Sequence, residues 1–209
     1  PPSGEWKTLV HSAAQMLPIS KGAMPNISLW LRAGQETSLQ VELRISSKPF
    51  NHTPDQTLET VEQPLHAGEQ EVILAFKCHI PSDCYAFVCF IKNEHVALQA
   101  CNSIVSGVMA TFNKCLPAVS NWGKQEPPAH IGVESFEFWC PERREKAYNI
   151  AMKITPGLRC FAPENLLAPP YRPVNKPNAW VAALHDKQPT LTLTWENERQ
   201  IKGIKLFTD

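Results

Sequence analysis

The sequence predicts an all-β protein built from two sandwich-like units. Short runs in which apolar and polar residues alternate recur along the chain, as expected of strands with one buried face. Proline is abundant, with 19 residues against 9 glycines, and it is tolerated in loops and edge strands but not in helix interiors. Long amphipathic helix patterns are hard to find. Together these features favour many short strands joined by rigid connections.

The first unit, assigned to residues 1–115, carries most of the alternating runs. Apolar positions alternate over 27–31 and 39–45, and the turn between these runs indicates a hairpin. The other strands expected in this unit are 57–61, 72–76, 85–91, 96–101 and 105–112. About eight strands in roughly 90 residues is the spacing of a jelly-roll-like sandwich. A short helical turn is expected at 9–16.

The second unit, assigned to residues 116–209, follows a proline-containing stretch in which the apolar pattern lapses. Strands are expected at 133–139 and 148–154. The C-terminal stretch is the most regular one: Leu191, Leu193 and Trp195 alternate with threonines, and further apolar positions follow at 201–206. We expect this stretch to form a hairpin with one buried face, with Trp195 in the core.

Charge and hydropathy argue against nucleic-acid and membrane partners. Lysine plus arginine and aspartate plus glutamate number 20 each, and no basic stripe marks a nucleic-acid-binding face. No apolar run approaches the ~20 residues of a membrane-spanning helix, so we expect no transmembrane segment. The N-terminus lacks the charged and apolar regions of a signal peptide.

Motifs for catalysis, metal binding and nucleotide binding are absent from the sequence. The seven cysteines include no Cys-x-x-Cys, and most are interpreted as small apolar residues in strands. A disulfide of Cys78 with either Cys84 or Cys101 stays open. The seven histidines are scattered singly, and neither Gly-x-Ser-x-Gly nor Gly-x-Gly-x-x-Gly occurs. We therefore expect no catalytic residue, metal site or cofactor in this chain.

The C-terminal quarter carries a family resemblance. Its motifs are Asn165-Leu166-Leu167, Asn178-Ala179-Trp180-Val181, the alternating run 191–195 and the strand 201–206. In this order they resemble the discoidin-like, galactose-binding-like β-sandwich. The Arg172-Pro173 and Asn178-Ala179-Trp180 loop is similar to the one in C-terminal regions of bacterial FAD-dependent oxidoreductase-like proteins. The resemblance implies a non-catalytic accessory region that packs on a parent catalytic domain.

The resemblance has two limits. A complete sandwich of this kind needs on the order of eight strands. The chain stops soon after the second strand of the motif. Either upstream strands complete a sandwich that is partial without them, or the chain is a piece of a longer protein. In addition, the flavin-binding residues of such oxidoreductases have no counterpart here, so FAD is expected only in a parent protein.

One loop of the second unit is the predicted ligand site. Its aromatic, amide and charged side chains are those of Tyr171, Arg172, Asn178, Trp180 and His185. Such groups converge on hydroxyls in sugar sites, so a carbohydrate-like ligand is expected, with Arg172 and Asn178 as the preferred contacts. Alternatively, Trp180 closes the core and Asn178 fixes the turn. A free-standing carbohydrate-binding module is the alternative function.

Overall fold

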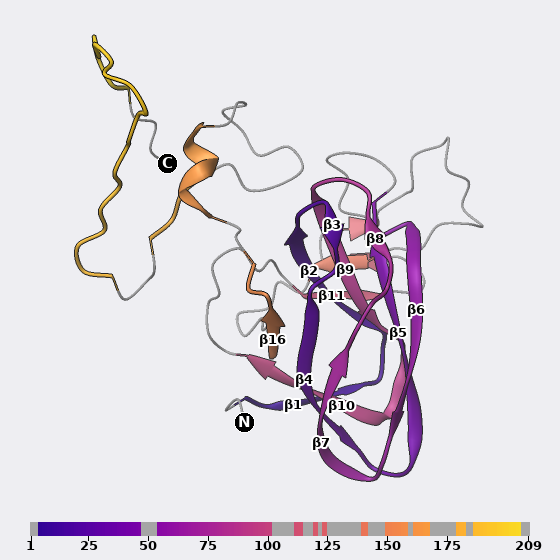
Figure 1. The fold of residues 1–209 in the computed structure, drawn as a ribbon. Coiled ribbons are helices and arrows are strands. Elements are labelled where there is room, and N and C mark those ends of the chain that lie inside the picture. Colours follow the sequence, from indigo (N-terminus) through magenta and orange to yellow (C-terminus); the bar gives the residue numbers. More distant parts are fainter. Residues whose placement is uncertain are drawn as a thin grey trace.

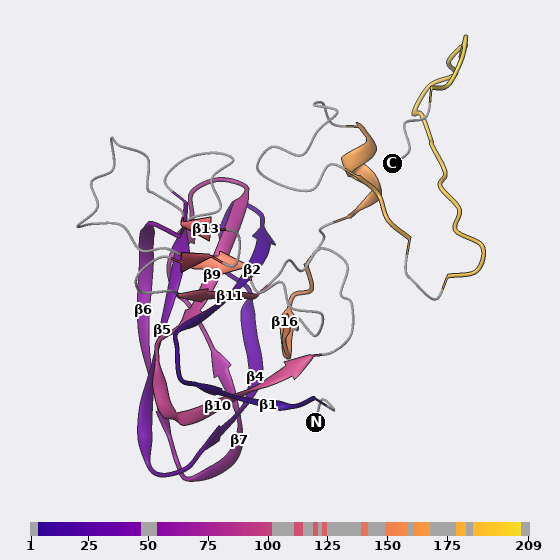
Figure 2. The ribbon, with the colours of Figure 1, turned by 180° about the vertical axis from the view of Figure 1, so that it is seen from behind.

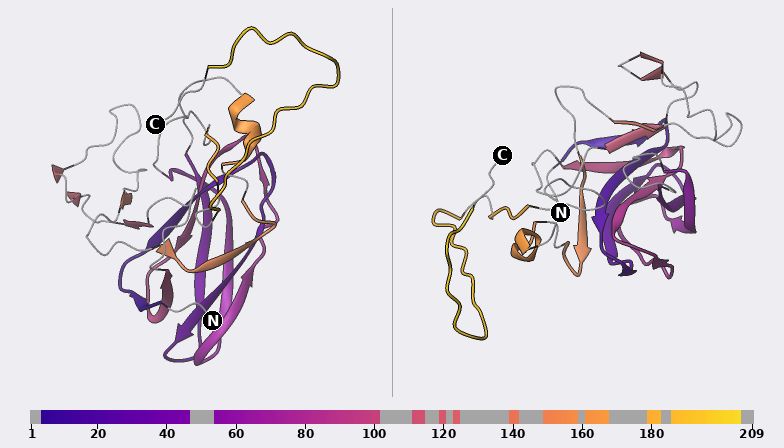
Figure 3. Two further views of the ribbon diagram at one scale, coloured as in Figure 1. Left: turned by 90° about the vertical axis from the view of Figure 1, so that its left-hand side faces the viewer. Right: turned by 90° about the horizontal axis from the view of Figure 1, so that it is seen from above.

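The computed structural model of the chain is an all-β sandwich, which confirms the predicted fold class (Figure 1). Among the described residues, the only helical segment is a short 3-10 helix, η2 (Pro163–Leu167). Viewed from above (Figure 3, right), the sheets curve around a common core. The described residues are 4–46, 54–101, 111–114, 119–120, 123–124, 139–141, 149–158, 161–167, 179–182 and 186–205.

Sheet I, the first of two six-stranded sheets, is centred on β4. Its strands are β1 (Trp6–Leu9), β10 (Asn93–Cys101), β4 (Asn26–Ala33), β16 (Met152–Thr155), β7 (Gly68–Leu74) and β15 (Asn149–Ile150). Strand β7 pairs with β4 along one edge, while β10 and β16 pair in succession along the other. Strand β1 pairs with the far edge of β10. Every one of these pairings is antiparallel.

Sheet II has the order β14–β11–β2–β9–β5–β6. Its strands are β14 (Trp139–Pro141), β11 (Thr111–Lys114), β2 (Ala13–Ile19), β9 (Cys84–Phe90), β5 (Thr37–Ile45) and β6 (Gln56–Leu65). Two short ribbons complete the described strands: β3 (Gly22–Ala23) with β8 (His79–Ile80), and β12 (Val119–Ser120) with β13 (Gly123–Lys124).

The main core lies between the two sheets and follows the alternation of the sequence. The inward side chains of β4 and β5 are buried: Ile27, Leu29, Leu31, Leu39, Val41, Leu43 and Ile45. The predicted strands are therefore correct here, but the predicted hairpin between them is wrong. Strand β4 lies in sheet I and β5 in sheet II, so the connection crosses the sandwich. Alternation cannot distinguish the two arrangements, because in both each strand buries one face.

The start of the chain also differs from the expectation. The helical turn predicted at 9–16 is absent, and this region instead holds the end of β1 and the start of β2. All seven residues of β2 are buried, so the strand lacks the alternation that marks a half-exposed one. Met16 of β2 joins Phe87 and Cys89 of β9 in a second, smaller cluster on the outer face of sheet II.

Residues 149–155 lie between β4 and β10, at the point where these two strands diverge. Strand β15 pairs with the end of β10, Ala151 donates its backbone N–H to the Gln99 carbonyl at 2.8 Å, and β16 pairs with β4. Figures 1 and 2 show β16 alongside β4. The boundary between the two predicted units at 115/116 remains a prediction. With a boundary there, β16 would belong to the second unit by sequence but to a sheet of the first unit by pairing.

Gln15 connects this insertion to the opposite sheet. Its side chain is fully buried. Its Oε1 accepts the backbone N–H of Ile150 at 2.8 Å, and its Nε2 donates to Asn149 Oδ1 at 3.2 Å and to the Met16 carbonyl at 3.5 Å. Because β2 belongs to sheet II, this amide hydrogen-bonds the two sheets through the core.

The predicted C-terminal hairpin is not formed. Residues 189–205 contain no strand, and they lie apart from the sandwich in Figures 1 and 2. Leu193 is 43%, Trp195 48% and Ile204 68% exposed, so Trp195 is not a core residue. The physical reason is that a two-stranded hairpin is marginal without a second apolar layer, and here no described layer covers this stretch.

We predict that Gln15→Leu lowers the free energy of unfolding by about 1–3 kcal/mol, because the buried N–H of Ile150 then has no acceptor from Gln15. Urea denaturation measures the change. Gln200→Leu is the matched control at an exposed position and is expected to stay within about 0.5 kcal/mol of the original chain. Equal stabilities of the two variants would contradict a structural role for the Gln15 amide.

Candidate ligand-binding face

The predicted ligand loop is described only in part. Tyr171, Arg172, Asn178 and His185 lie outside the described residues, and Trp180 is half-buried.

The turns on either side of this loop do meet. Asn165 Nδ2 donates to the Ala179 carbonyl at 3.0 Å, and the Val181 N–H donates to the Phe161 carbonyl at 3.3 Å. The Asn-Leu-Leu turn therefore holds the Ala179-Trp180 segment in place.

A second group of aromatic and charged side chains lies on the sheet I outer face, the face turned away from the core. Because Ile27, Leu29 and Leu31 point inward, Trp30 and Arg32 of β4 point outward. The register adds residues from the neighbouring strands. The residues that define this face are Trp6, Thr8, Ser28, Trp30, Arg32, Glu69, Glu71, Ala97, Gln99 and Lys153.

The two tryptophans lie on either side of β10. Trp6 on β1 is opposite Gln99 of β10. Beyond the last β10–β4 pair, Leu98 and Leu31, the two strands diverge and Ala151 hydrogen-bonds to Gln99. The Cα positions of Trp6 and Trp30 are therefore separated by at least two inter-strand spacings, about 10 Å or more. Both rings are half-buried, while Ala97 and Gln99 between them are buried at 6% and 7% exposure. The residues of β10 between the two rings are therefore covered by the larger side chains around them.

Arg32 reaches across β10 toward Trp6. Its guanidinium carbon lies 4.8 Å from the centroid of the Trp6 ring, within cation–π range. The partner of Arg32 on β10 is Ala97, whose small side chain leaves room for this crossing. Glu69 on the other side of β4 lies 3.9 Å from the guanidinium. The pair is about half exposed, so its energy is small, and its effect is to orient Arg32.

With the other polar groups included, this face carries equal numbers of positive and negative side chains. Ser28 donates its hydroxyl hydrogen to the Glu71 carboxylate. Lys153 of β16 is directly opposite Ser28 and exposed. Two cations, Arg32 and Lys153, therefore accompany two carboxylates, Glu69 and Glu71.

Close packing of the N-terminal strand fixes the position of Trp6. The Ala100 N–H donates to the Glu5 carbonyl at 2.8 Å, and Gln99 Nε2 donates to the Gly4 carbonyl at 3.5 Å. A Cβ at Gly4 would lie 1.5 Å from the Ala100 carbonyl oxygen, so this approach requires glycine. The absence of a side chain at position 4 thus allows β1 to lie flat against β10.

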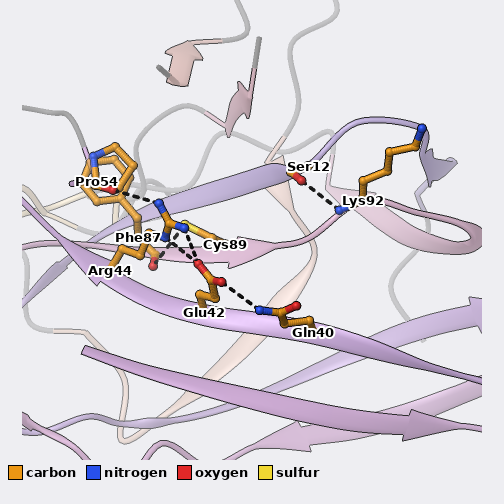
Figure 4. A network of polar contacts seen from close by, with 8 residues as sticks. All are labelled: Ser12, Gln40, Glu42, Arg44, Pro54, Phe87, Cys89 and Lys92. Carbon is orange, nitrogen blue, oxygen red and sulfur yellow. Dashed lines mark hydrogen bonds and ion pairs between the residues drawn. The ribbon is translucent and has the colours of Figure 1, made fainter. Parts of the chain in front are cut away.

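The outer face of sheet II has a different character (Figure 4). Arg44 donates to Glu42 at 2.6 Å through Nε, Gln40 donates to the other Glu42 oxygen at 2.9 Å, and Arg44 Nη1 donates to the Pro54 carbonyl at 3.3 Å. Both charged side chains are only 12% exposed, beside buried Phe87 and Cys89. These polar groups bind one another within the protein, so we assign them a structural role.

The described residues offer little for nucleophilic or metal chemistry. Cys78, Cys84, Cys89 and Cys101 are free thiols, so neither disulfide that the sequence left open is formed. Burial raises the pKa of Cys84 from 9.0 to about 11, with Asp83 adding to the effect. Burial, then the hydrogen bond and charge of Glu59, raise the pKa of Cys78 to about 11 as well. Thiols with raised pKa values are weak nucleophiles.

The described residues hold neither a metal-binding cluster nor a membrane-spanning helix. They contain no group of three or more histidine, cysteine, aspartate or glutamate side chains placed to hold a metal ion. Among these residues, no helix is long and apolar enough to cross a membrane.

Sequence reasoning missed Trp6, Trp30 and Arg32. A signal was present in β4: Trp30 occupies an outward position of a strand whose inward positions are all apolar. A large aromatic ring at such a position, where polar residues are the norm, indicates a surface that binds a ligand or another protein. For Trp6 the short strand β1 gave no comparable pattern.

In comparisons with known proteins, no protein-family model, no curated protein and no solved structure matches this chain.

We predict that the folded state loses stability as the pH rises through the interval from about 9 to about 11. In this interval the unfolded chain releases the protons of Cys78 and Cys84 while the folded chain retains them, so the free energy of unfolding falls with pH. Urea denaturation at several pH values measures the slope. The double variant Cys78→Ala/Cys84→Ala is expected to have a shallower slope, and an unchanged slope would show that these thiols do not contribute.

Proposed function

We propose that this chain is a non-catalytic, ligand-binding β-sandwich and that its sheet I outer face binds a carbohydrate-like ligand. One observation carries the proposal: two half-buried tryptophans share one sheet face with exposed charged side chains. Sugars present apolar C–H faces that pack on aromatic rings, and hydroxyls that pair with amides and carboxylates.

The contacts within this face support the proposal because they limit the cost of binding. Arg32 is already held between the Trp6 ring and Glu69, and Ser28 already orients Glu71. Side chains that are ordered before binding lose less conformational entropy when a ligand arrives. The proposed site is distinct from the loop predicted at Tyr171, Arg172, Asn178, Trp180 and His185, which remains a second candidate for the same kind of ligand.

We predict that Trp6→Ala and Trp30→Ala each weaken glycan binding by at least several-fold, because each removes one stacking surface. Affinity electrophoresis in gels containing soluble polysaccharides measures the binding. Trp195→Ala is the matched control, since it removes an exposed tryptophan outside this face. Arg172→Ala and Asn178→Ala test the predicted loop. Binding that is lost only in these last two variants would move the site to the loop.

A second candidate function is suggested by the exposed apolar residues of the C-terminal stretch. As the resemblance implies, the chain would be an accessory region of a FAD-dependent oxidoreductase-like protein, packed on its catalytic domain. The supporting observation is that Leu193, Trp195, Ile201 and Ile204 are all exposed. Neighbouring apolar residues exposed in this way are typical of surfaces that contact another protein.

We predict that the isolated chain self-associates through these residues. Analytical ultracentrifugation is expected to find oligomers that dissociate in the triple variant Leu193→Ser/Trp195→Ser/Ile204→Ser. A monodisperse monomer before substitution would count against the accessory role. The parent protein is tested separately: the native polypeptide that carries these residues should be larger than this chain and yellow from bound flavin.

A further inference from the structure

We infer that the ligand of the sheet I outer face is a neutral oligosaccharide that runs across the strands, and that acidic glycans are disfavoured. The inference rests on the function proposed above and specifies its ligand in three respects: length, direction and charge. Each respect follows from a separate feature of the face.

The length follows from the separation of the two rings. Trp6 and Trp30 are attached to strands on either side of β10, and at least two inter-strand spacings, about 10 Å or more, separate their Cα positions. A single sugar ring is too small to stack on both. A ligand that uses both tryptophans is therefore an oligosaccharide, and its affinity should rise steeply at the length that reaches the second ring.

The direction follows from the strand order. The row Trp6, Trp30 and Glu71 crosses from β1 over β10 to β4 and β7. Gln99 and Ala97 on β10 are only 7% and 6% exposed, so the side chains of this row cover them. The guanidinium of Arg32 lies over the Trp6 ring, at one end of the row. A ligand that contacts both Trp6 and Trp30 therefore runs perpendicular to the strands.

The charge preference follows from the ionic groups. Arg32 is engaged by the Trp6 ring and by Glu69, so a ligand carboxylate or sulfate would compete with contacts already made. Glu71 lies at the end of the row, and its carboxylate accepts from Ser28. Sugar hydroxyls can donate to the carboxylates of Glu69 and Glu71, whereas anionic groups are repelled by them. Lys153 is the one further cation of the face, beside Ser28 and off this row.

The test measures binding of the full chain to defined probes by isothermal titration calorimetry. The neutral probes are cellotetraose, xylotetraose, mannotetraose and galactotetraose with their disaccharides. The acidic probes are tetragalacturonate and a heparin-derived tetrasaccharide. We expect at least one neutral tetrasaccharide to bind at least tenfold more tightly than its disaccharide and than either acidic probe. Trp6→Ala and Trp30→Ala should each lower this affinity to about that of the disaccharide, and Trp195→Ala should leave it unchanged.

Two further variants guard against trivial loss of folding and test the charge argument. Trp6→Phe keeps an aromatic surface and is expected to retain part of the affinity that Trp6→Ala loses. Glu69→Gln/Glu71→Gln removes both carboxylate charges while keeping the side-chain size. It is expected to raise the affinity for tetragalacturonate relative to the neutral tetrasaccharides.

The outcomes separate the inference from the proposed function. If an acidic probe binds as tightly as any neutral one and this binding needs Trp6 and Trp30, the face binds glycans but the charge preference is overturned. If disaccharides bind as tightly as tetrasaccharides, the assignment of length is overturned. If no probe binds, or if the tryptophan variants bind as before, the proposed function itself is overturned.

Discussion

The sandwich depends on one buried amide. Gln15 lies in the middle of β2 with no exposure to solvent, and its side chain satisfies the backbone of β15 across the core. A buried polar group of this kind is stable only when its partners are present, and the partners need it equally. The contact therefore specifies which segment fills the gap between β4 and β10. A purely apolar side chain at this position would pack against many segments equally well.

Much of the fold was predictable because alternation reports burial directly. The strands around Ile27–Leu31 and Leu39–Ile45 were placed correctly for this reason, as were those that became β6 and β7. Strands β9 and β10 were also placed, although five consecutive residues of each are buried and the signal there was an apolar run. Alternation says nothing about the partner of a strand, so the crossing from β4 to β5 was predicted as a hairpin. It also fails for β2, which is buried on both faces. Trp195 shows the converse limit, since a regular apolar stripe is buried only where another layer exists to cover it.

The candidate site was less predictable than the fold, and for a different reason. Residues of a sheet face come together by register across strands that are far apart in sequence: Trp6, Trp30, Glu71 and Gln99 lie on four strands. No local motif marks such a set. The loop with Arg172 and Asn178, in contrast, was chosen because its polar and aromatic residues are contiguous in sequence. Residues that are neighbours in sequence are easy to recognise as a group. They do not indicate which residues become neighbours on the face of a folded sheet.

The insertion of residues 149–155 also governs the order in which the sandwich can be completed. Strand β16 pairs with β4 although more than a hundred residues separate them in the chain. Contacts at such long range form late, because the intervening loop must close first. During synthesis, a nascent chain that has not yet released Asn149 and Ile150 from the ribosome leaves the Gln15 amide without its hydrogen bonds to these two residues. The sandwich is therefore completed only after the segment 149–155 has been synthesised, and until then the place beside β4 is open to other strands.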